Sequence, residues 1–194
     1  MQDSKKTLAN LVIGLLTFVV STSYAAISSP QVCFTPGENC ACLLINEINH
    51  TQQSILVQAY SFTAMPIAEA LVAAEMRGVD VRVILDKSQV KDQRSVYDYL
   101  RAANIPVWID SHVAIAHNKV MIFDQDEVAT GSYNYTKSAD RANAENMIIL
   151  NDSDLAKKYT ANWNKRLAAS QDSTTYAEYL SNHKKQNKNN YLRY

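Results

Sequence analysis

Glycine and proline are scarce in this sequence, with four of each among 194 residues. Neither sign of charge prevails, because 19 Lys and Arg residues balance 19 Asp and Glu residues. With 47% apolar residues, the composition excludes a collagen-like or a disordered chain. The zero net charge argues against a protein that holds nucleic acid through a generally basic surface. We expect one globular domain with its own hydrophobic core, and we find no internal repeat.

Long apolar runs are missing except near the N-terminus. There, Lys5 and Lys6 precede an apolar run at residues 11–20, and small residues follow up to Ala25. A run of about ten residues is too short for a comfortable membrane span, but it suits a secretory signal. We therefore expect residues 1–25 to be a signal peptide that is cleaved after Ala25, so that the mature protein is periplasmic or secreted. A retained N-terminal anchor is the alternative.

The three cysteines of the chain are Cys33, Cys40 and Cys42. Export would place them in an oxidising compartment, where a disulfide can form. The turn residues Pro36 and Gly37 allow Cys33 to pair with either of the other two, and the sequence leaves the partner open. Zinc is a weaker explanation, because neither the spacing of the cysteines nor a nearby histidine suits a closed site.

The spacing of apolar residues alternates between strand-like and helix-like. Runs rich in β-branched and aromatic residues predict strands at residues 55–62, 81–86, 107–109, 119–124, 127–132 and 146–150. Three- and four-residue spacing predicts helices around residues 41–48, 67–74, 96–103 and 155–167. Asp152 or Ser153 would cap the last of these helices. Because strand–helix alternation precedes a hairpin, we expect an α/β fold with a mixed β-sheet flanked by helices.

The expected domain covers residues 26–170, and residues 171–194 form a polar, basic C-terminal tail. The last twelve residues, HKKQNKNNYLRY, hold four Lys or Arg residues and no acid. A second group of cations, Lys87, Lys91 and Arg94, follows a predicted strand. Such groups are most often solvated surface, and they gain interest only beside a site that handles phosphate.

One stretch, HNKVMIFDQDEVATGSYN, groups polar residue types that are typical of catalytic sites. His117 and Lys119 are two positions apart, so they point to the same face of a strand. The following hairpin returns the chain antiparallel and brings Ser132 and Asn134 back beside them. Gly131 allows the backbone to approach closely at this point. We therefore expect an imidazole, an ammonium, a hydroxyl and a carboxamide to converge.

This set of side chains suits the cleavage of a phosphodiester. Lysine and asparagine donate to oxyanions, and histidine is a nucleophile or a general acid near neutral pH. The non-bridging oxygens of a phosphodiester need such donors, and its phosphorus needs an attacking group in line with the leaving oxygen. Each of these residues alone would be ordinary solvated surface, but their combined spacing is not.

The pattern HxKxxxxD, followed after six residues by GSxN, resembles the signature of the phospholipase D superfamily. Six positions match it: His117, Lys119, Asp124, Gly131, Ser132 and Asn134. The likeness extends over roughly residues 35 to 168, through AYSFTAMPIAEALVAAEMRGVDVRVILD, GSYNYT and AENMIIL. With a signal peptide and one motif, the chain resembles the small secreted bacterial endonucleases of that superfamily, which are related to a plasmid-borne, chelator-resistant nuclease.

The resemblance implies a role for each matching residue. His117 would attack phosphorus and form a covalent phosphohistidine, while Lys119 and Asn134 would bind the non-bridging oxygens. Ser132 would support the site by hydrogen bonding. Glu145, in the segment AENM, stands where such enzymes have a glutamate that fixes the tautomer of the histidine. A surface carboxylate at the start of a strand is the alternative interpretation of Glu145.

Two other motif positions are expected to be structural. Gly131 shapes the backbone, and Asp124 lies at the far end of its strand, roughly 17 Å from Lys119 at about 3.3 Å per residue. The neighbouring carboxylates of Asp126 and Glu127 belong to the same turn, away from the donors. We therefore expect no metal site and no cofactor.

A single motif leaves the acid for the leaving oxygen unassigned. Superfamily members with two motifs supply both histidines from one chain, whereas His50, His112 and His183 of this chain lie outside any HxK pattern. His112 could line the substrate groove, although we favour a role in a turn. The simplest solution is a homodimer with the active site at its interface, in which two His117 rings face one phosphate.

The function expected from these residues is that of a metal-independent, non-specific endonuclease that acts on DNA and possibly on RNA. A phospholipase D-type lipid phosphodiesterase is the alternative, because the motif recognises the phosphodiester and not what is attached to it. The sequence has no amphipathic membrane helix, so we expect no stable membrane association after signal cleavage. A non-catalytic nucleic-acid-binding protein is a weaker hypothesis, since binding alone does not need an oriented imidazole.

Overall fold

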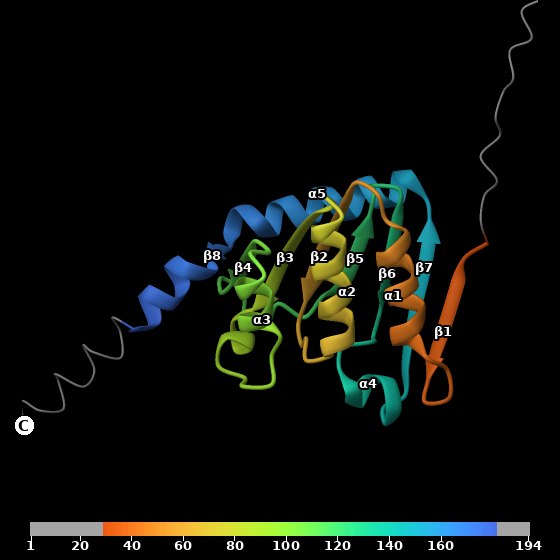
Figure 1. The fold of residues 1–194 in the computed structure, drawn as a ribbon, viewed down its shortest axis with the longest axis horizontal. Helices are drawn as coiled ribbons and strands as arrows, with labels where there is room; N and C mark the ends of the chain where they lie inside the picture. The colour runs from red at the N-terminus through yellow and green to blue at the C-terminus, as the bar shows by residue number, and fades with distance from the viewer. Residues whose placement is uncertain (1–28, 182–194) are drawn as a thin grey trace, which may run out of the picture.

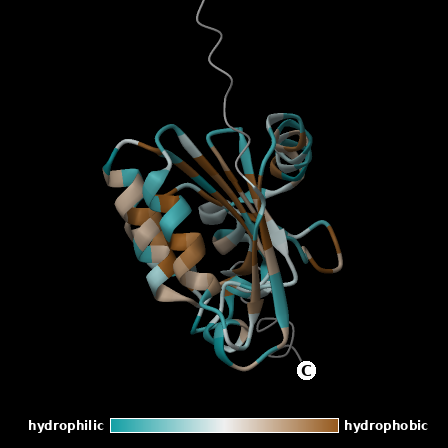
Figure 2. Ribbon diagram, turned by 90° about the vertical axis from the view of Figure 1, so that its right-hand side faces the viewer, coloured by the Kyte–Doolittle hydropathy of each residue, from teal (hydrophilic) through white to brown (hydrophobic). Residues whose placement is uncertain are grey.

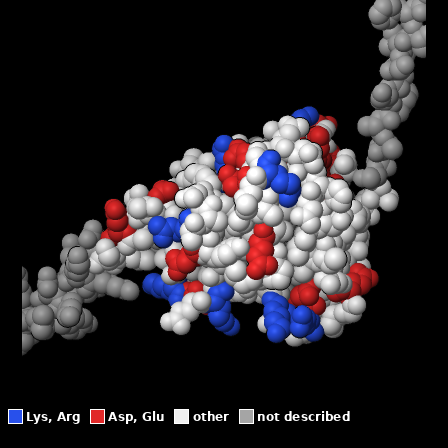
Figure 3. Space-filling view, viewed as in Figure 1, with Lys and Arg blue, Asp and Glu red and all other residues white. Residues whose placement is uncertain are grey.

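The structure is a computed structural model, and it describes residues 29–181. The expected signal peptide, residues 1–25, and the basic end of the chain, residues 183–194, lie outside the described residues. No helix within the described part is long and apolar enough to cross a membrane. Acidic and basic side chains are interspersed over the face of the molecule that carries α1 and α2, as Figure 3 shows.

An eight-stranded mixed sheet is the central layer of the described chain (Figure 1). Its strands are β1 (Gln31–Thr35), β2 (Ser54–Ala59), β3 (Asp80–Asp86), β4 (Val107–Asp110), β5 (Lys119–Phe123), β6 (Glu127–Gly131), β7 (Glu145–Asn151) and β8 (Gln171–Asp172). They lie in the order β1-β7-β6-β5-β2-β3-β4-β8. β2, β3 and β4 run parallel, and the other neighbouring pairs are antiparallel. The predicted α/β fold with a mixed sheet is confirmed.

Helices cover both faces of the sheet. They are α1 (Cys40–His50), α2 (Met65–Met76), the 3-10 turn η1 (Lys87–Val90), α3 (Tyr97–Ala102), α4 (Lys137–Arg141) and α5 (Ser153–Ala169). α1 and α2 pack on one face and α5 on the other, so that the sheet is seen between them in Figure 2. The apolar residues accordingly form two clusters, a larger one under α1 and α2 and a smaller one under α5.

β5 shows why the alternation of residues in this sheet matters. Met121 and Phe123 belong to the larger apolar cluster, whereas Val120 and Ile122 belong to the cluster under α5. Because both faces are covered, all five residues of β5 are buried. Apart from its first residue, Lys119, the sequence of this strand is therefore a continuous apolar run.

α5 is fixed firmly to the sheet. Its N-cap is Asp152, whose carboxylate accepts from the backbone N–H groups of Asp154 and Leu155 at 3.0 Å. Of the two caps considered from the sequence, the structure thus selects Asp152. Further along, the buried indole of Trp163 donates to the carbonyl oxygen of Val57 in β2 at 2.9 Å. The helix is therefore a rigid support for any side chain on its exposed face.

A disulfide between Cys33 in β1 and Cys40 at the start of α1 links these two elements. The Cα atoms of the two cysteines are 5.7 Å apart. This settles the pairing that the sequence left open, and Cys42 is free and exposed. β1 itself was not predicted. It is an edge strand that pairs with β7 alone, and its Val32 and Phe34 remain exposed, so its pattern lacks a buried run.

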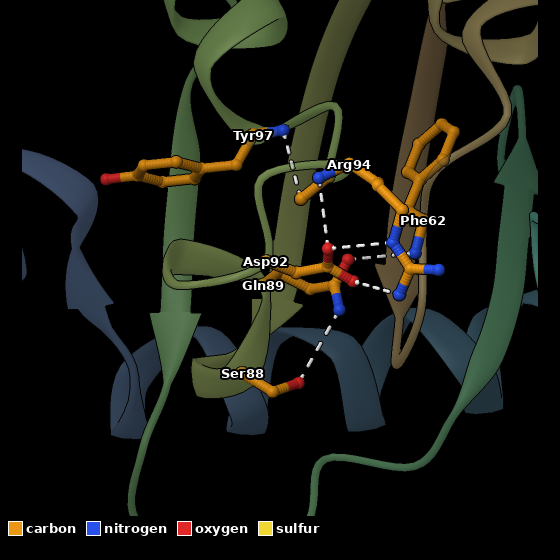
Figure 4. Close-up of polar contacts among 7 residues, drawn as sticks. Phe62, Ser88, Gln89, Asp92, Arg94 and Tyr97 are labelled. Carbon is orange, nitrogen blue, oxygen red and sulfur yellow. Dashed lines mark hydrogen bonds and ion pairs between the residues drawn. The ribbon is translucent and has the colours of Figure 1, made fainter.

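The predicted strand 55–62 ends earlier than expected, at Ala59. Beyond it, Phe62 forms only an isolated bridge with Tyr135. Figure 4 shows what holds Phe62 instead: its backbone N–H donates to the buried carboxamide of Gln89 at 3.0 Å. The chain leaves the sheet here because Gln89 in η1 and the backbone N–H of Val96, rather than a neighbouring strand, supply the hydrogen-bond partners of Phe62.

Two of the three cations that follow β3, Lys87 and Arg94, make contacts with other groups of the protein. Arg94 pairs with Asp92 at 3.2 Å (Figure 4), and Lys87 donates to the carbonyl oxygen of Val113 at 2.9 Å. Neither these two cations nor Lys91 lines the pocket described below. The interpretation of this group as ordinary surface is therefore the one that the structure favours.

The packed part of the chain continues past residue 170, where the sequence placed the end of the domain. β8 adds to the sheet beside β4, and residues 173–181 are α-helical. Tyr176 is buried, and the hydroxyl of Tyr97 donates to the carbonyl oxygen of Ser173 at 3.2 Å. These aromatic contacts pack the segment after residue 170 against the domain, and they could not be inferred from a mostly polar sequence.

Candidate active site

A pocket of about 880 Å³ opens beside α5, at the edge of the sheet formed by the ends of strands β5, β6 and β7. We call this the catalytic edge. The five residues with expected catalytic roles all line it, together with one of the two structural motif residues: His117, Lys119, Ser132, Asn134, Glu145 and Gly131. Strand direction explains this convergence. β5 and β7 begin at this edge and β6 ends there, so the residues at these strand ends meet.

Gly131 makes the turn out of β6 possible. Its φ is +152°, a backbone conformation that residues with side chains rarely adopt. A Cβ atom at this position would lie 2.2 Å from the carbonyl oxygen of Asn146. That same oxygen accepts from the backbone N–H groups of Ser132 and Tyr133, at 3.0 and 3.1 Å. The glycine is therefore required to place Ser132 against β7.

Tyr60 organises the imidazole and the ammonium. Its ring centroid lies 4.6 Å from that of His117, with the planes inclined at 51°. The Nζ atom of Lys119 lies 5.1 Å from the same Tyr60 centroid and donates to the carbonyl oxygen of His117 at 2.6 Å. Sequence reasoning missed Tyr60, because only the pairing of β2 with β5 brings the end of one strand beside the start of the other.

Lys119 is 6% exposed, whereas His117 is exposed to solvent. Burial lowers the pKa of Lys119 below its ordinary value, and the negative charge of Glu145 partly opposes this effect. A buried ammonium is stabilised by an anion that approaches it. The physical setting of Lys119 therefore favours an anionic ligand at this edge of the sheet.

Asn134 carries a buried side-chain oxygen, Oδ1, that has no hydrogen-bond partner among the described residues. Buried polar atoms are nearly always satisfied in a working protein, and an exception commonly marks a site that a ligand or water completes. Asn134 lines the pocket, so water or a donor group of a ligand can complete Oδ1, while the NH2 group of the same carboxamide is the donor for an anionic oxygen.

Glu145 is held by two donors. The hydroxyl of Ser132 donates to one carboxylate oxygen at 2.6 Å, and the carboxamide of Asn143 donates to the other at 2.9 Å. Ser132 in turn accepts from the backbone N–H of Asn146 at 3.1 Å. The expected hydrogen bond from His117 to Glu145 is not among the contacts of the described residues. In this state of the protein, Glu145 instead orients Ser132.

Asp124 lies at the opposite end of β5, away from the pocket. Its carboxylate accepts from three consecutive backbone N–H groups, those of Gln52, Gln53 and Ser54, at 3.0, 2.7 and 2.9 Å. Its φ of +49° fits the tight turn into β6. These contacts fasten the start of β2 to the hairpin, which is the kind of structural role expected for this motif residue.

The remaining histidines with described positions do not line the pocket. His112 is exposed in the loop before β5, and His50 lies at the end of α1, where its Nδ1 contacts the carbonyl oxygen of Asn46 at 2.8 Å. His183 lies outside the described residues. Residues 29–181 hold no group of three or more His, Cys, Asp and Glu side chains arranged to bind a metal ion.

One face of α5 adds side chains that the motif does not contain. Leu155, Lys158, Tyr159 and Asn162 line the same pocket. The sequence indicated that Leu155 and Tyr159 face the core. Both are half-buried, and Tyr159 packs against the apolar cluster under α5. Their pocket-facing neighbours were missed, because the position of the helix over the sheet decides which flank meets the site.

Comparison with known proteins identifies the family. A family model described as cardiolipin synthase, PLD-like domain, matches residues 44–167. The chain belongs to the phospholipase D superfamily. The chain is 45% identical over 142 residues to a phospholipase D of Rickettsia felis, which covers 73% of this chain and 71% of the relative. It is also 30% identical over 152 residues to the mitochondrial cardiolipin hydrolase of Xenopus laevis, covering 73% and 72% of the two chains.

Solved structures of the superfamily have the same fold. Nuc from Salmonella typhimurium, a phospholipase D family member, superposes with a TM-score of 0.71 at 37% identity, covering 74% of this chain and 97% of Nuc. NucT from Helicobacter pylori gives a TM-score of 0.69 at 26% identity, covering 74% and 98%. The resemblance inferred from HxKxxxxD and GSxN is therefore confirmed, and the protein is a phosphodiesterase of this superfamily.

Proposed function

We propose that the protein is a nuclease that cleaves phosphodiester bonds of nucleic acid at this pocket. The observation that carries the proposal is the set of hydrogen-bonding side chains in the pocket walls, which stand beside the apolar parts of Val120, Leu155 and Tyr159. Beyond the motif residues, they present the side chains of Gln58, Asn118, Lys158 and Asn162. Such groups suit a substrate with charged phosphates and polar sugars better than one with acyl chains. The alignment covers 97% of Nuc at 37% identity, and this similarity supports the same interpretation.

In the proposed reaction, a ring nitrogen of His117 attacks phosphorus and forms an N–P bond while the bond to the leaving oxygen breaks. An acid protonates that oxygen. Water then attacks the phosphohistidine, releases the phosphate monoester and gives its proton to the same group, which has become a base. Lys119 and the carboxamide of Asn134 stabilise the charge on the non-bridging oxygens, because both line the pocket beside His117.

The proposed reaction does not use a metal ion. The charge of the transferring phosphoryl group has to be stabilised by something, and the buried ammonium of Lys119 is placed to do so. Ser132 and Glu145 would act one step away, by holding the β6–β7 edge of the site through their 2.6 Å hydrogen bond.

The acid is proposed to come from a second copy of the chain. Among residues 29–181, His117 is the one histidine that lines the pocket, so a two-fold dimer would bring a second imidazole to the same phosphate. Export is part of the same proposal. The disulfide between Cys33 and Cys40 supports an oxidising compartment, in line with the expected signal peptide at residues 1–25.

A lipid phosphodiesterase is the second candidate, and two observations favour it. Relatives at 45% and 30% identity are named phospholipase D and mitochondrial cardiolipin hydrolase. In addition, Ile115 is 55% exposed in the loop that leads to His117. An exposed aliphatic side chain beside a catalytic edge can contact acyl chains.

A parallel assay separates the two candidates. Purified mature protein is incubated in excess EDTA with plasmid DNA, RNA, phosphatidylcholine vesicles and cardiolipin vesicles, with His117→Ala as the control. We expect nucleic acid to be cleaved, the lipids to remain intact and the variant to be inactive. Hydrolysis of lipid with intact DNA and RNA would replace the nuclease proposal by its alternative. Activity that requires added magnesium would refute the metal-free mechanism.

A further inference from the structure

The α5 wall of the pocket carries a cation that the motif chemistry does not use. Lys158 lines the same cavity as His117 and Lys119, although it lies on a helix far from them in the sequence. Leu155, Lys158 and Asn162 are spaced by three and four residues, so they share one flank of α5. This flank faces the catalytic edge of the sheet.

Lys158 is free to bind a ligand. It is exposed, and its one described interaction is a longer-range attraction to the carboxylate of Asp154, without a direct hydrogen bond or ion pair. Its neighbour Lys157 differs in this respect, because it pairs with Asp154 at 3.0 Å. The two lysines therefore present the same charge from adjacent positions of the helix, but only Lys158 lines the pocket.

The helix holds this flank in place. Tyr159 is half-buried and packs against the apolar cluster that contains Trp163, and Trp163 donates to Val57 in the sheet. The backbone that carries Lys158 and Asn162 is consequently rigid with respect to β2. A subsite built on such an element can favour one spacing between bound groups.

The charges around the pocket indicate what this flank binds. Of the residues that the structure describes, two lysines and one carboxylate line the cavity, and the carboxylate of Glu145 already accepts from Ser132 and Asn143. Lys119 is buried at the catalytic edge, whereas Lys158 stands on a different element. A substrate with one phosphate needs one of these cations, while a substrate with phosphates in series can engage both.

We propose that Lys158, assisted by the carboxamide of Asn162, forms a subsite for the phosphate that flanks the scissile phosphate in a nucleic-acid strand. This inference rests on the proposed nuclease function and adds the residues that bind the strand beyond the reacting centre. Lys158 is a binding residue here, and it takes no part in bond making or breaking.

The test compares Lys158→Ala with Lys157→Ala on two substrates. One is a single-stranded oligonucleotide, and the other is bis(p-nitrophenyl) phosphate, which has a single phosphate. Alanine is the best helix former, so both variants should keep α5 intact. For Lys158→Ala, we expect kcat/KM on the oligonucleotide to fall about tenfold through KM, and activity on the small substrate to be unchanged. Lys157→Ala should resemble the wild type on both.

Salt dependence provides a second measurement. Each phosphate contact to a single strand contributes about 0.7 to the slope of log binding constant against log salt concentration. Binding of the oligonucleotide to a His117→Ala protein in EDTA should therefore lose about that amount of slope when Lys158→Ala is added. Lys158→Arg, which keeps the charge, should restore the slope.

The outcomes separate this proposal from the function on which it rests. Equal behaviour of Lys158→Ala and Lys157→Ala on the oligonucleotide would overturn the subsite and leave the nuclease function standing. A loss that is as large on bis(p-nitrophenyl) phosphate would also overturn it, because the effect would then not depend on a second phosphate. Wild-type protein that hydrolyses the small substrate but no oligonucleotide would refute the nuclease function and the subsite together.

Discussion

The hydroxyl of Ser132 donates a 2.6 Å hydrogen bond to the carboxylate of Glu145, across the ends of two neighbouring strands. Ser132 directly follows Gly131, the last residue of β6, whose positive φ suits glycine, and Glu145 begins β7. The bond ties the GSxN segment to the next strand. It therefore links the position of Asn134, two residues beyond Ser132, to the edge of the sheet.

Loss of this bond should weaken catalysis without unfolding the protein. In Ser132→Ala, Glu145 keeps only Asn143 as a donor, and the backbone N–H of Asn146 loses its side-chain acceptor. We expect kcat on an oligonucleotide to fall by about tenfold or more, because a hydrogen bond to a charged group is lost next to the reacting centre. The midpoint of thermal unfolding should stay near the wild-type value. Unchanged turnover would remove Ser132 from the account of the site.

Asp124→Asn should lower stability and spare the chemistry. The Asp124 carboxylate serves three backbone N–H groups at the start of β2, and an amide offers a single acceptor oxygen. We expect the free energy of unfolding to fall by about 1–2 kcal/mol, measured by urea denaturation. Asp126→Asn is the matched control in the same turn, with little change expected. A large loss of kcat in fully folded Asp124→Asn protein would contradict the structural role.

The central strands of the sheet could be predicted from the sequence, whereas its edge strands could not. Continuous apolar runs such as VRVILD and the hairpin from Lys119 to Gly131 identified the central strands, because burial on both faces leaves a strong pattern. β1 and β8 were missed, since one is an exposed edge strand and the other has two residues. Edge pairing depends on neighbours that local periodicity does not reveal.

The residues of the candidate site also fall into two groups, those that the sequence could place together and those that only tertiary packing brings there. The convergence of the motif side chains could be predicted from spacing, because a hairpin fixes which side chains meet, whereas their catalytic roles were inferred from the resemblance to the phospholipase D superfamily. Tyr60 and Lys158 could not be assigned, since each reaches the site through tertiary packing: Tyr60 by the pairing of β2 with β5, and Lys158 by the path of α5 over the sheet. The contact of Glu145 with Ser132, in place of His117, was also beyond the sequence pattern.

The stability of the protein should depend on pH through the carboxyl group of Glu127, which begins β6 at the end of the hairpin away from the pocket. Burial, followed by the nearby carboxylate of Glu47, raises the pKa of Glu127 to about 7. The folded protein thus holds this proton more tightly than the unfolded chain, whose glutamate has an ordinary pKa near 4.5. The resulting stabilisation is present below that ordinary value and is lost as pH rises toward 7.

Glu127→Gln removes this titration. We expect its melting temperature to exceed that of the wild type at pH 8, and the difference to shrink toward pH 4.5, as measured by calorimetry across that range. Glu69→Gln, at an exposed position on α2, is the control and should track the wild type throughout. A difference between Glu127→Gln and the wild type that does not vary with pH would contradict the assignment.

The proposed dimer makes a quantitative prediction for mixed subunits. If two His117 side chains from two chains serve one phosphate, a dimer with one His117→Ala chain should be nearly inactive. Random pairing of equal amounts leaves about a quarter of the dimers fully wild-type, so activity per total dimer should fall toward that fraction. Retention of one half would indicate a complete site in each chain, and His112 would then be the first residue to examine as the acid.

The most direct test of the central claim is to trap the covalent intermediate on His117. The protein is mixed with an excess of a single-stranded oligonucleotide in EDTA, denatured rapidly at alkaline pH, where phosphohistidine survives, and analysed by peptide mass spectrometry. We predict a phosphoryl adduct that carries the nucleotide fragment on His117, and no adduct in His117→Ala protein. An adduct on a different residue, or rapid turnover of the oligonucleotide by His117→Ala protein, would contradict the account.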